Sequence, residues 1–398
     1  MIIEPKVRGF ICTTAHPAGC YESVKSQIDY VKLQPWIQSA PKNVLIIGAS
    51  TGYGLASRIV STYAAGAKTI GVFFEKPASE KRTATAGWYN TSAFEKMAHE
   101  DGYYAKSING DAFSDEIKEE TIQLIRKDLR SVDLVIYSLA SPRRTDPKTG
   151  KIYSSTLKPI GKAYCNKTVD PLTGIVSEIS IAPANQEEID NTIAVMGGED
   201  WAMWIDALQK ANALSDKAIT FAYSYIGPSL THPIYKNGTI GKAKNHLLQT
   251  AQVLNEKLKN TGGCAFVSVN KALVTQSSSA IPVVPLYISI LFKIMKKAGT
   301  HENCVEQIYR LMNTFFCDNK AASVDSERQI RIDDLEMKSD VQNQIEKIWT
   351  EISTQNINAL ADLEGYKRDF YKLFGFEIEG VDYQKEIDID VKIPSIGN

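Results

Sequence analysis

Residues 43–54 read NVLIIGASTGYG, an apolar run followed at once by a glycine-rich turn. A continuous apolar run is typical of a parallel strand that is buried on both faces. Beyond the turn, Leu55, Ile59 and Tyr63 recur at helical spacing and predict a helix. The stretch therefore predicts a strand, a tight turn and a helix, which together begin a βαβ unit.

The alternation of strands and helices continues on the C-terminal side of this stretch. Strands joined by helices at such spacing predict a parallel sheet with right-handed crossovers. The fold class is therefore α/β, a doubly wound and mostly parallel Rossmann-type sheet. We expect further strands at residues 69–75, 105–113 (a short strand and its turn), 133–140, 218–227 and 264–270, and helices at 91–100, 114–129, 201–208 and 244–258.

Two segments depart from this rhythm. Residues 141–185 are rich in Pro, Lys, Thr and Gly and predict an insertion of hairpins and loops. Residues 276–398 are mostly helical in pattern and predict a substrate loop and helix followed by a helical cap, with one edge strand in the acidic run 377–390. We expect a single domain over residues 1–398, with a dinucleotide-binding core over 43–275.

Composition limits the class of protein. The chain has 398 residues, 43% of them hydrophobic, and a net charge of −1, without the basic excess of a dedicated nucleic-acid binder. Its six cysteines form no CxxC pair, which favours reduced thiols. The most apolar stretch, residues 280–292, is too short to span a membrane. No secretory signal is visible, so we expect a cytoplasmic protein that binds neither nucleic acid nor membrane.

Gly48, Gly52 and Gly54 form the pattern G-x-x-x-G-x-G between the predicted strand and helix. Glycine lets the backbone turn tightly and approach a pyrophosphate without Cβ atoms in the way. The N–H groups at the start of the helix then face the phosphates. Glycine patterns also occur in plain turns, but the strand before and the helix after favour dinucleotide binding.

Glu75 ends the second predicted strand, 21 positions after Gly54. A carboxylate near this spacing accepts hydrogen bonds from the adenosine ribose and repels a 2′-phosphate, which favours NADH over NADPH. The alternative is a solvated charge at a strand end. Ligands of such sheets lie at the carboxyl ends of the strands. By the same rule the adenine is expected at Asp111 and Ala112, and the edge of the cofactor at Leu139 and Ala140.

Tyr235 and Lys244 follow the fifth predicted strand, where a nicotinamide ring would lie. Nine residues of helix turn through about 900°, which would place the two side chains on opposite faces. Because of the Asn237-Gly238 turn signal, we expect the helix to begin near Gly241 and Tyr235 to lie on a loop. A phenol can donate its proton to an oxyanion, and Tyr225 could supply a second phenol. The alternative is that both tyrosines only cap the core.

The chain closely resembles the FabV-type enoyl-acyl-carrier-protein reductases and the related trans-2-enoyl-CoA reductases, over essentially its whole length. The resemblance includes VRGFICTTAHPAGC, GASTGYG, FFE, SLASPRR and LVTQSSSAIPVVPLY. The most specific part is Tyr-x8-Lys, since ordinary short-chain dehydrogenases, which share the fold, have Tyr-x3-Lys and their enoyl reductases Tyr-x6-Lys. The resemblance implies NADH-dependent reduction of the carbon–carbon double bond of a trans-2-enoyl thioester, the last reductive step of fatty acid elongation.

The resemblance also implies roles for particular residues. Tyr235 and Lys244 are expected to be catalytic, with Tyr235 as proton donor and Lys244 also on the cofactor, and Tyr225 is expected to bind substrate. The expected partner is a thioester of acyl-carrier protein or of CoA, and the expected state is a monomer. The expected NADH-binding residues are Gly48, Ala49, Ser50, Thr51, Gly52, Tyr53, Phe74, Glu75, Asp111, Ala112, Leu139, Ala140, Lys244, Leu273, Val274 and Thr275.

Two other functions remain as alternatives. A short-chain ketoreductase would use the same phenol to protonate a carbonyl oxygen, but the Tyr-x8-Lys spacing disfavours it. A non-catalytic NADH-binding sensor would keep the glycine turn and lose the donor, whereas this chain has both Tyr235 and Lys244.

The apolar stretch after residue 278 follows a strand end that is expected to touch the cofactor. We expect Ile281, Val284, Leu286 and Ile290 to wall a slot for the acyl chain. Ordinary core packing is the alternative, because apolar walls are common to both.

The insertion is locally basic and could bind CoA phosphates or an acidic carrier protein. A solvated hairpin face is at least as good an interpretation. The basic residues are Arg143, Arg144, Lys148, Lys151, Lys158 and Lys162.

Cys12, His16 and Cys20 have spacings that suggest a metal site, but no fourth ligand cluster accompanies them. We therefore expect no metal. His232 lies near Tyr235, and a loop histidine beside a proline is expected to have a structural role.

Overall fold

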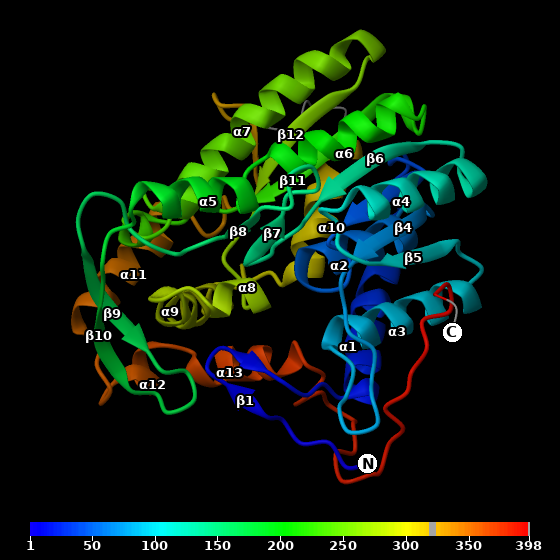
Figure 1. The fold of residues 1–398 in the computed structure, drawn as a ribbon. Helices are drawn as coiled ribbons and strands as arrows, with labels where there is room; N and C mark the ends of the chain where they lie inside the picture. The colour runs from blue at the N-terminus through cyan, green and yellow to red at the C-terminus, as the bar shows by residue number, and fades with distance from the viewer. Residues whose placement is uncertain (318–323, 397–398) are drawn as a thin grey trace.

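The computed structural model describes residues 1–317 and 324–396, and its centre is a seven-stranded parallel sheet. The strand order β13-β12-β11-β6-β3-β4-β5 confirms the doubly wound Rossmann-type fold (Figure 1). The strands are β3 (Asn43–Ile47), β4 (Lys68–Phe73), β5 (Ala105–Asn109), β6 (Val132–Tyr137), β11 (Leu214–Ser224), β12 (Cys264–Val269) and β13 (Gln329–Arg331).

The sheet is covered by helices on both faces, as the continuous apolar run of β3 requires. Val44 and Ile46 face one layer, and Leu45 and Ile47 face the other. The first layer contains α1 (Pro17–Lys32), α2 (Gly52–Tyr63), α3 (Ala86–Glu100) and α10 (Cys304–Cys317). The second contains α4 (Asp115–Asp128), α6 (Glu199–Lys210) and α7 (Thr239–Leu258).

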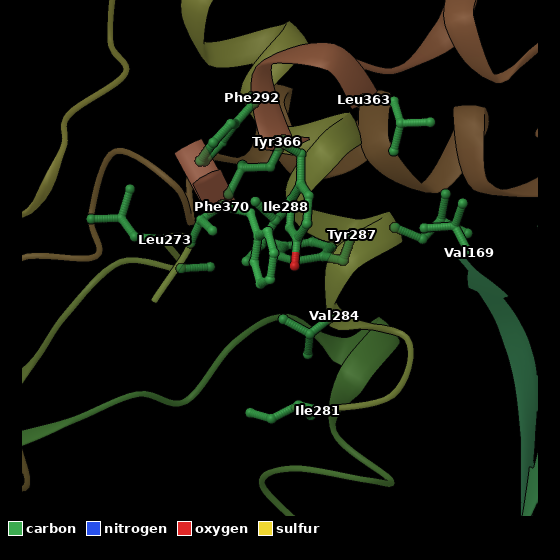
Figure 2. Close-up of a cluster of buried hydrophobic side chains, with 14 of the residues drawn as sticks. Val169, Leu273, Ile281, Val284, Tyr287, Ile288, Phe292, Leu363, Tyr366 and Phe370 are labelled. Carbon is green, nitrogen blue, oxygen red and sulfur yellow. The ribbon is translucent and has the colours of Figure 1, made fainter. Parts of the chain in front are cut away.

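A third apolar cluster joins the insertion to the C-terminal helices. Its centre is α9 (Val284–Lys297), which packs against α11 (Ser339–Glu351) and α13 (Leu363–Lys372). In Figure 2, Tyr287 and Phe292 of α9 lie against Tyr366 and Phe370 of α13. The hairpin of β9 (Tyr164–Val169) and β10 (Val176–Ile181) also packs here, so the insertion shares a core with the cap.

The remaining elements are short or peripheral. They are β1 (Val7–Arg8), β2 (Ile11–Cys12), β7 (Arg143–Thr145), β8 (Ile152–Ser154), α5 (Gln186–Met196), η1 (Ser229–Thr231), η2 (Lys259–Thr261), α8 (Gln276–Ser279) and α12 (Ile357–Leu360). In the described parts of the chain, no helix combines the length and apolar character that a membrane span needs.

Three expectations about the fold were wrong in part. The sheet has a seventh strand, β13, which comes from the segment expected to be helical. Helix α3 begins five residues before its expected start at 91, and α7 begins at Thr239, two residues before the start expected near Gly241 and five before the periodic stretch 244–258. The acidic run 377–390 contains no strand and is an extended tail. The residues that follow it bind α3, where the Trp88 indole N–H donates to the Val391 carbonyl at 2.7 Å. Figure 1 shows this tail running beside α3.

Candidate active site

A cavity of about 530 Å³ opens at the carboxyl edge of the sheet. It is lined by the ends of the central strands, the start of α7 and the segment from α8 into α9. Most of the residues expected at the site meet in this one cavity. They are Gly48, Ser50, Thr51, Gly52, Tyr53, Phe74, Glu75, Asp111, Ala112, Leu139, Ala140, Tyr225, Tyr235, Lys244, Leu273 and Thr275.

The turn between β3 and α2 tolerates only glycine at two of its positions. Gly48 has φ +87°, and a Cβ on it would lie 2.4 Å from the Ser138 carbonyl oxygen. A Cβ on Gly54 would lie 1.8 Å from the Gly48 carbonyl oxygen. Thr51 caps α2 without a side-chain hydrogen bond, so the first N–H groups of the helix remain available to a ligand. The turn therefore fits a pyrophosphate.

Glu75 follows β4 and is fixed at the cavity by its neighbours. Its Oε1 accepts a hydrogen bond from the Ser50 hydroxyl at 2.7 Å, and its backbone N–H donates to Asn109 Oδ1 at 2.8 Å. Burial raises the pKa of Glu75, while hydrogen bonds from Thr85 and Ser50 oppose that shift. The adjacent Phe74 is 75% exposed and lines the same cavity, so an aromatic face is open to a ligand beside the carboxylate.

Tyr235 and Lys244 reach the cavity from a loop and a helix respectively. Tyr235 follows η1, and its N–H donates to the Thr231 carbonyl at 2.9 Å. Helix α7 begins at Thr239, after the cap residue Gly238, so the expected break between Tyr235 and the helix is present. Because the chain is not helical between them, both side chains line one cavity.

Burial changes the acid–base chemistry of this pair. It raises the pKa of Tyr235, so the phenol keeps its proton. It lowers the pKa of Lys244 to about 8, because the charged ammonium is poorly solvated there. The Lys244 ammonium donates to the Tyr223 carbonyl oxygen at 3.2 Å. The cavity thus holds a protonated phenol and a lysine whose pKa lies well below its usual value.

Tyr225 lies next to Tyr235, with ring centroids 5.0 Å apart in an edge-to-face arrangement. Its hydroxyl donates to Glu336 Oε1 at 3.0 Å. Glu336 comes from the turn between β13 and α11, and sequence reasoning missed it. No local pattern marks it, because it lies 111 positions from Tyr225 in the chain.

Other residues of the site were also missed, and two expected residues lie elsewhere. Ala49 and Val274 do not line the cavity: Ala49 is fully buried, and Val274 packs in the third apolar cluster. Some of the missed residues lie at the carboxyl ends of predicted strands, and that position could have identified them in the sequence. The missed lining residues include Ser138, Tyr223, Asn270, Lys271, Ser277 and Ile288.

Of the four residues expected to wall an acyl slot, the structure brings two to the cavity. Ile281 and Val284 line the cavity, and Ile288 joins them one helical turn further along α9. Leu286 and Ile290 do not line it; both are fully buried in the core. Positions four apart share a helix face, whereas positions two apart do not. Figure 2 shows Ile281, Val284 and Ile288 on successive levels below Phe292.

The expected basic patch of the insertion is smaller than its composition suggested. Arg144 is 2% exposed and pairs with Glu199 at 2.6 Å. Lys158 pairs with Glu188 at 2.5 Å. The exposed basic residues that remain are Arg143, Lys148, Lys151 and Lys162.

The histidines singled out in the sequence make structural contacts. His16 caps α1, where its Nδ1 accepts from the Gly19 N–H at 3.2 Å. A ring nitrogen of His232 lies 3.0 Å from the Gly227 carbonyl oxygen. Within residues 1–317 and 324–396, no three His, Cys, Asp or Glu side chains gather as they would around a metal ion.

The chain matches three family models and has close relatives along its whole length. Residues 82–316 match the trans-2-enoyl-CoA reductase catalytic region, and residues 2–80 match the NAD(P)H binding domain of trans-2-enoyl-CoA reductase. An NADH-dependent enoyl-acyl-carrier-protein reductase from Coxiella burnetii is 60% identical over all of this chain and 98% of its own. An NADH-dependent trans-2-enoyl-CoA reductase from Ruminiclostridium cellulolyticum is 57% identical, and both chains are covered completely. 

The fold is also similar to that of a solved relative. The crystal structure of trans-2-enoyl-CoA reductase from Treponema denticola in complex with NAD aligns with a TM-score of 0.93 at 50% identity, covering 97% of this chain and 98% of that one.

The third family model, an enoyl reductase FAD binding domain, matches residues 324–387. This segment does not fit a flavin in the present structure. Its glycines, Gly365, Gly375 and Gly380, do not lie in a turn between a strand and a helix, and none of its residues lines the 530 Å³ cavity. Residues 324–387 instead supply β13, Glu336 and the helices that pack against α9.

Proposed function

The chain belongs to the trans-2-enoyl-CoA reductase family, and we propose that its large cavity is the site where a trans-2-enoyl thioester is reduced. The protein is an oxidoreductase that uses NADH to reduce enoyl thioesters, as its named relatives do. The observation that supports this site is that the glycine turn, Tyr235 and Lys244 line a single cavity. The ketoreductase and sensor alternatives find no support among these relatives.

The residues present suit NADH. The N–H groups at the start of α2 would bind its pyrophosphate, and Glu75 would accept from the adenosine ribose and repel a 2′-phosphate. Phe74, Asp111 and Ala112 would surround the adenine end. Bound NADH supplies the hydride that adds to the β-carbon of the enoyl group.

The chain's own residues then stabilise and protonate the product of hydride addition. Addition to the β-carbon leaves an enolate whose charge lies on the thioester oxygen. Tyr235 donates its phenol proton to this enolate, and Lys244 holds positive charge near the phenolate that forms. The apolar walls at Ile281, Val284 and Ile288 exclude water from the acyl chain. The thioester is carried by CoA or by acyl-carrier protein.

The enzyme is further proposed to act as a monomer. The C-terminal tail covers one of the two edge strands of the sheet, β5, where the Ser107 N–H donates to the Ser395 hydroxyl at 2.8 Å. A covered edge strand does not offer its backbone to a second copy. Light scattering should give a mass near 44.0 kDa. A mass of a dimer or tetramer would contradict the proposal.

The experiment that tests the site follows NADH oxidation by absorbance with crotonyl-CoA as substrate, in the wild type and in Tyr235→Phe. The substitution removes only the proton donor, so we expect turnover to fall by about 100-fold or more with NADH binding unchanged. Tyr21→Phe, a phenol of α1 outside the cavity, is the matched control and should keep full activity. Unchanged turnover in Tyr235→Phe would show that the donor assignment is wrong.

A further inference from the structure

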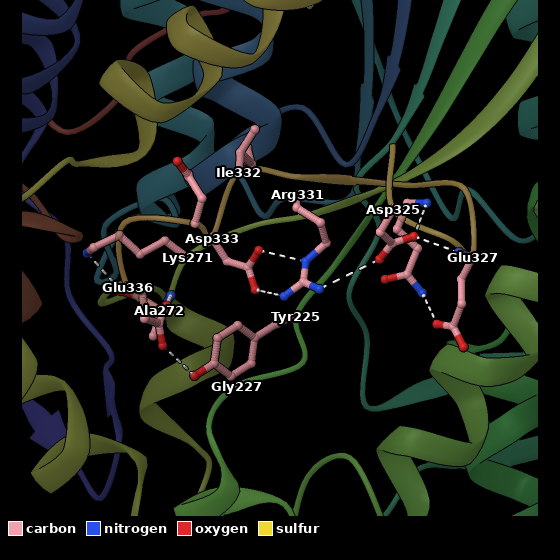
Figure 3. Close-up of polar contacts among 12 residues, drawn as sticks. Tyr225, Gly227, Lys271, Ala272, Asp325, Glu327, Arg331, Ile332, Asp333 and Glu336 are labelled. Carbon is pink, nitrogen blue, oxygen red and sulfur yellow. Dashed lines mark hydrogen bonds and ion pairs between the residues drawn. The ribbon is translucent and has the colours of Figure 1, made fainter. Parts of the chain in front are cut away.

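The buried carboxylate of Glu336 lies at the centre of a small polar network behind the cavity. Its side chain is fully buried. Oε1 accepts from the Tyr287 hydroxyl at 2.6 Å and from the Tyr225 hydroxyl at 3.0 Å, and Oε2 accepts from the Ala272 N–H at 2.7 Å. Figure 3 draws the contact between the Tyr225 hydroxyl and Glu336 as a dashed line. Three donors therefore converge on one carboxylate.

The turn that carries Glu336 is itself held firmly. Arg331 donates to both oxygens of Asp333, at 2.8 and 2.6 Å, and its guanidinium lies 3.6 Å from Asp325 (Figure 3). The Gln342 amide donates to the Glu336 carbonyl at 2.7 Å. These contacts fix the turn against β13 and α11, so the carboxylate has a defined position relative to Tyr225.

The geometry favours the ionised form of Glu336. The Ala272 N–H can only donate, and both phenols lie within hydrogen-bond distance of the other oxygen. The pKa of Glu336 is raised, mainly by burial, and the hydrogen bonds from Tyr287, Ala272 and Tyr225 and the nearby Lys271 ammonium make this rise smaller. An ionised carboxylate accepts from all three donors at once, which leaves none of them unpaired.

A phenol has one proton to donate, and Tyr225 uses it in the hydrogen bond to Glu336. The Tyr225 oxygen can then offer only a lone pair to the cavity. The Tyr235 hydroxyl has no hydrogen-bond partner among the described residues, and it lines the same cavity. The two neighbouring phenols thus differ in which of them has a proton free for substrate.

We propose that Glu336 is a positioning residue of the reductase: by accepting the Tyr225 hydroxyl it fixes the Tyr225 ring at the substrate and leaves Tyr235 as the phenol that donates. This inference rests on the proposed function and deepens it. It also gives the C-terminal segment a role at the reductase's own site, through a side chain rather than through a second cofactor.

A double-mutant cycle between Glu336→Gln and Tyr225→Phe tests the proposal. In Glu336→Gln the amide oxygen must serve the Ala272 N–H, so the amide NH₂ would face the two phenol oxygens as a donor. The Tyr225 hydroxyl would lose its acceptor and its fixed orientation. We expect kcat/KM for an enoyl-CoA to fall about tenfold, with the dissociation constant of NADH unchanged.

The cycle separates positioning from support of the fold. If Glu336 acts through Tyr225, the loss caused by Glu336→Gln disappears in the Tyr225→Phe background. An equal loss in both backgrounds would overturn the proposal, because the residue would then act through Ala272 and the backbone alone. No loss in either background would also overturn it.

Three controls make the outcome readable. Glu327→Gln makes the same chemical change at an exposed carboxylate of the same segment and should leave kcat/KM unchanged. If Glu336→Gln does not fold, Glu336→Asp takes its place in the cycle, since the shorter side chain cannot reach all three donors. The wild type must reduce the enoyl thioester: failure there contradicts the proposed function, whereas an active wild type with an additive cycle contradicts only the role of Glu336.

Discussion

The proposed cofactor half and the proposed substrate half of the cavity are built in different ways. The cofactor half depends on backbone geometry within residues 43–54, with one carboxylate, Glu75, added by the next strand. The substrate half depends on side chains that come from β11, α7, α9 and the turn before α11. Backbone geometry is encoded locally by glycine, whereas a side-chain network exists only after distant segments have packed.

This difference predicts how each half responds to substitution. In the cofactor half a methyl group added at Gly48 or Gly54 meets backbone atoms that cannot move aside. In the substrate half a substitution meets other side chains, which can rotate or lose one hydrogen bond. We therefore expect all-or-none effects in the first half and, apart from the proton donor Tyr235, graded effects in the second.

The largest effect is expected for Gly54→Ala. The new Cβ would lie 1.8 Å from the Gly48 carbonyl oxygen, so the turn must open and the pyrophosphate site is lost. NADH affinity, measured by fluorescence titration, should fall by about 100-fold or more. Gly102→Ala is the control, since no atom lies within 4 Å of its Cβ position. It should cost roughly 1 kcal/mol of stability for its positive φ and leave NADH binding intact. Normal NADH binding by Gly54→Ala would contradict the view that the turn geometry forms the cofactor site.

Lys244 should impose a pH dependence. Burial lowers its pKa to about 8, so the ammonium loses its proton as the pH rises through that value. If the charge is needed, kcat/KM should fall about tenfold per pH unit above the pKa. Lys244→Arg keeps its charge over this range and should remove the decline. 

A second lysine provides the control for this assignment. Burial also lowers the pKa of Lys271 to about 8, and it lines the same cavity. The decline should persist in Lys271→Met. If the decline persists in Lys244→Arg and disappears in Lys271→Met, the group that titrates is Lys271, and the assignment to Lys244 is wrong.

The elements that the sequence predicted well are those whose pattern is local. The apolar run of β3 and the glycine turn needed no tertiary information, and six of the seven strands of the described sheet were expected. The seventh, β13, has only three residues, among them Gln329 and Arg331, so it has no apolar pattern. It is a strand because β12 offers it a parallel edge.

The errors at the site have the same cause. Glu336 could not be found because a buried glutamate has no local signature and its partners lie far along the chain. Leu286 and Ile290 were placed in the slot because the first residue of α9 was unknown. Once α9 begins at Val284, the cavity face follows at Ile288, and residues two positions away turn into the core.

Chain-length preference tests that correction. Ile288→Phe adds volume to the cavity wall and should shift the preferred acyl chain to shorter lengths, with a several-fold loss for longer enoyl-CoAs. Ile290→Phe is the matched control: it lies in the core, so overpacking should cost about 1–3 kcal/mol of stability without changing the profile. A shifted profile in Ile290→Phe alone would restore the original expectation.

The smallest effect is expected at the insertion. Its exposed positive charges are Arg143, Lys148, Lys151 and Lys162, since Arg144 and Lys158 are already paired within the chain. If these charges attract an acidic carrier protein, reversing Lys148 and Lys151 to Glu should raise KM for the carrier substrate about two- to fivefold, because rim charges act mainly on encounter. The effect should shrink at high salt.

The control and the comparison of substrates decide what the patch recognises. Lys127→Glu, on exposed α4 surface outside the insertion, should change neither KM. A rise in KM for the carrier substrate alone assigns the patch to the protein carrier, and a rise for enoyl-CoA alone assigns it to the CoA phosphates. Unchanged values for both substrates leave a solvated hairpin face. In that case, the insertion contributes to the enzyme through the core that it shares with α9 and through its contacts with the start of α7.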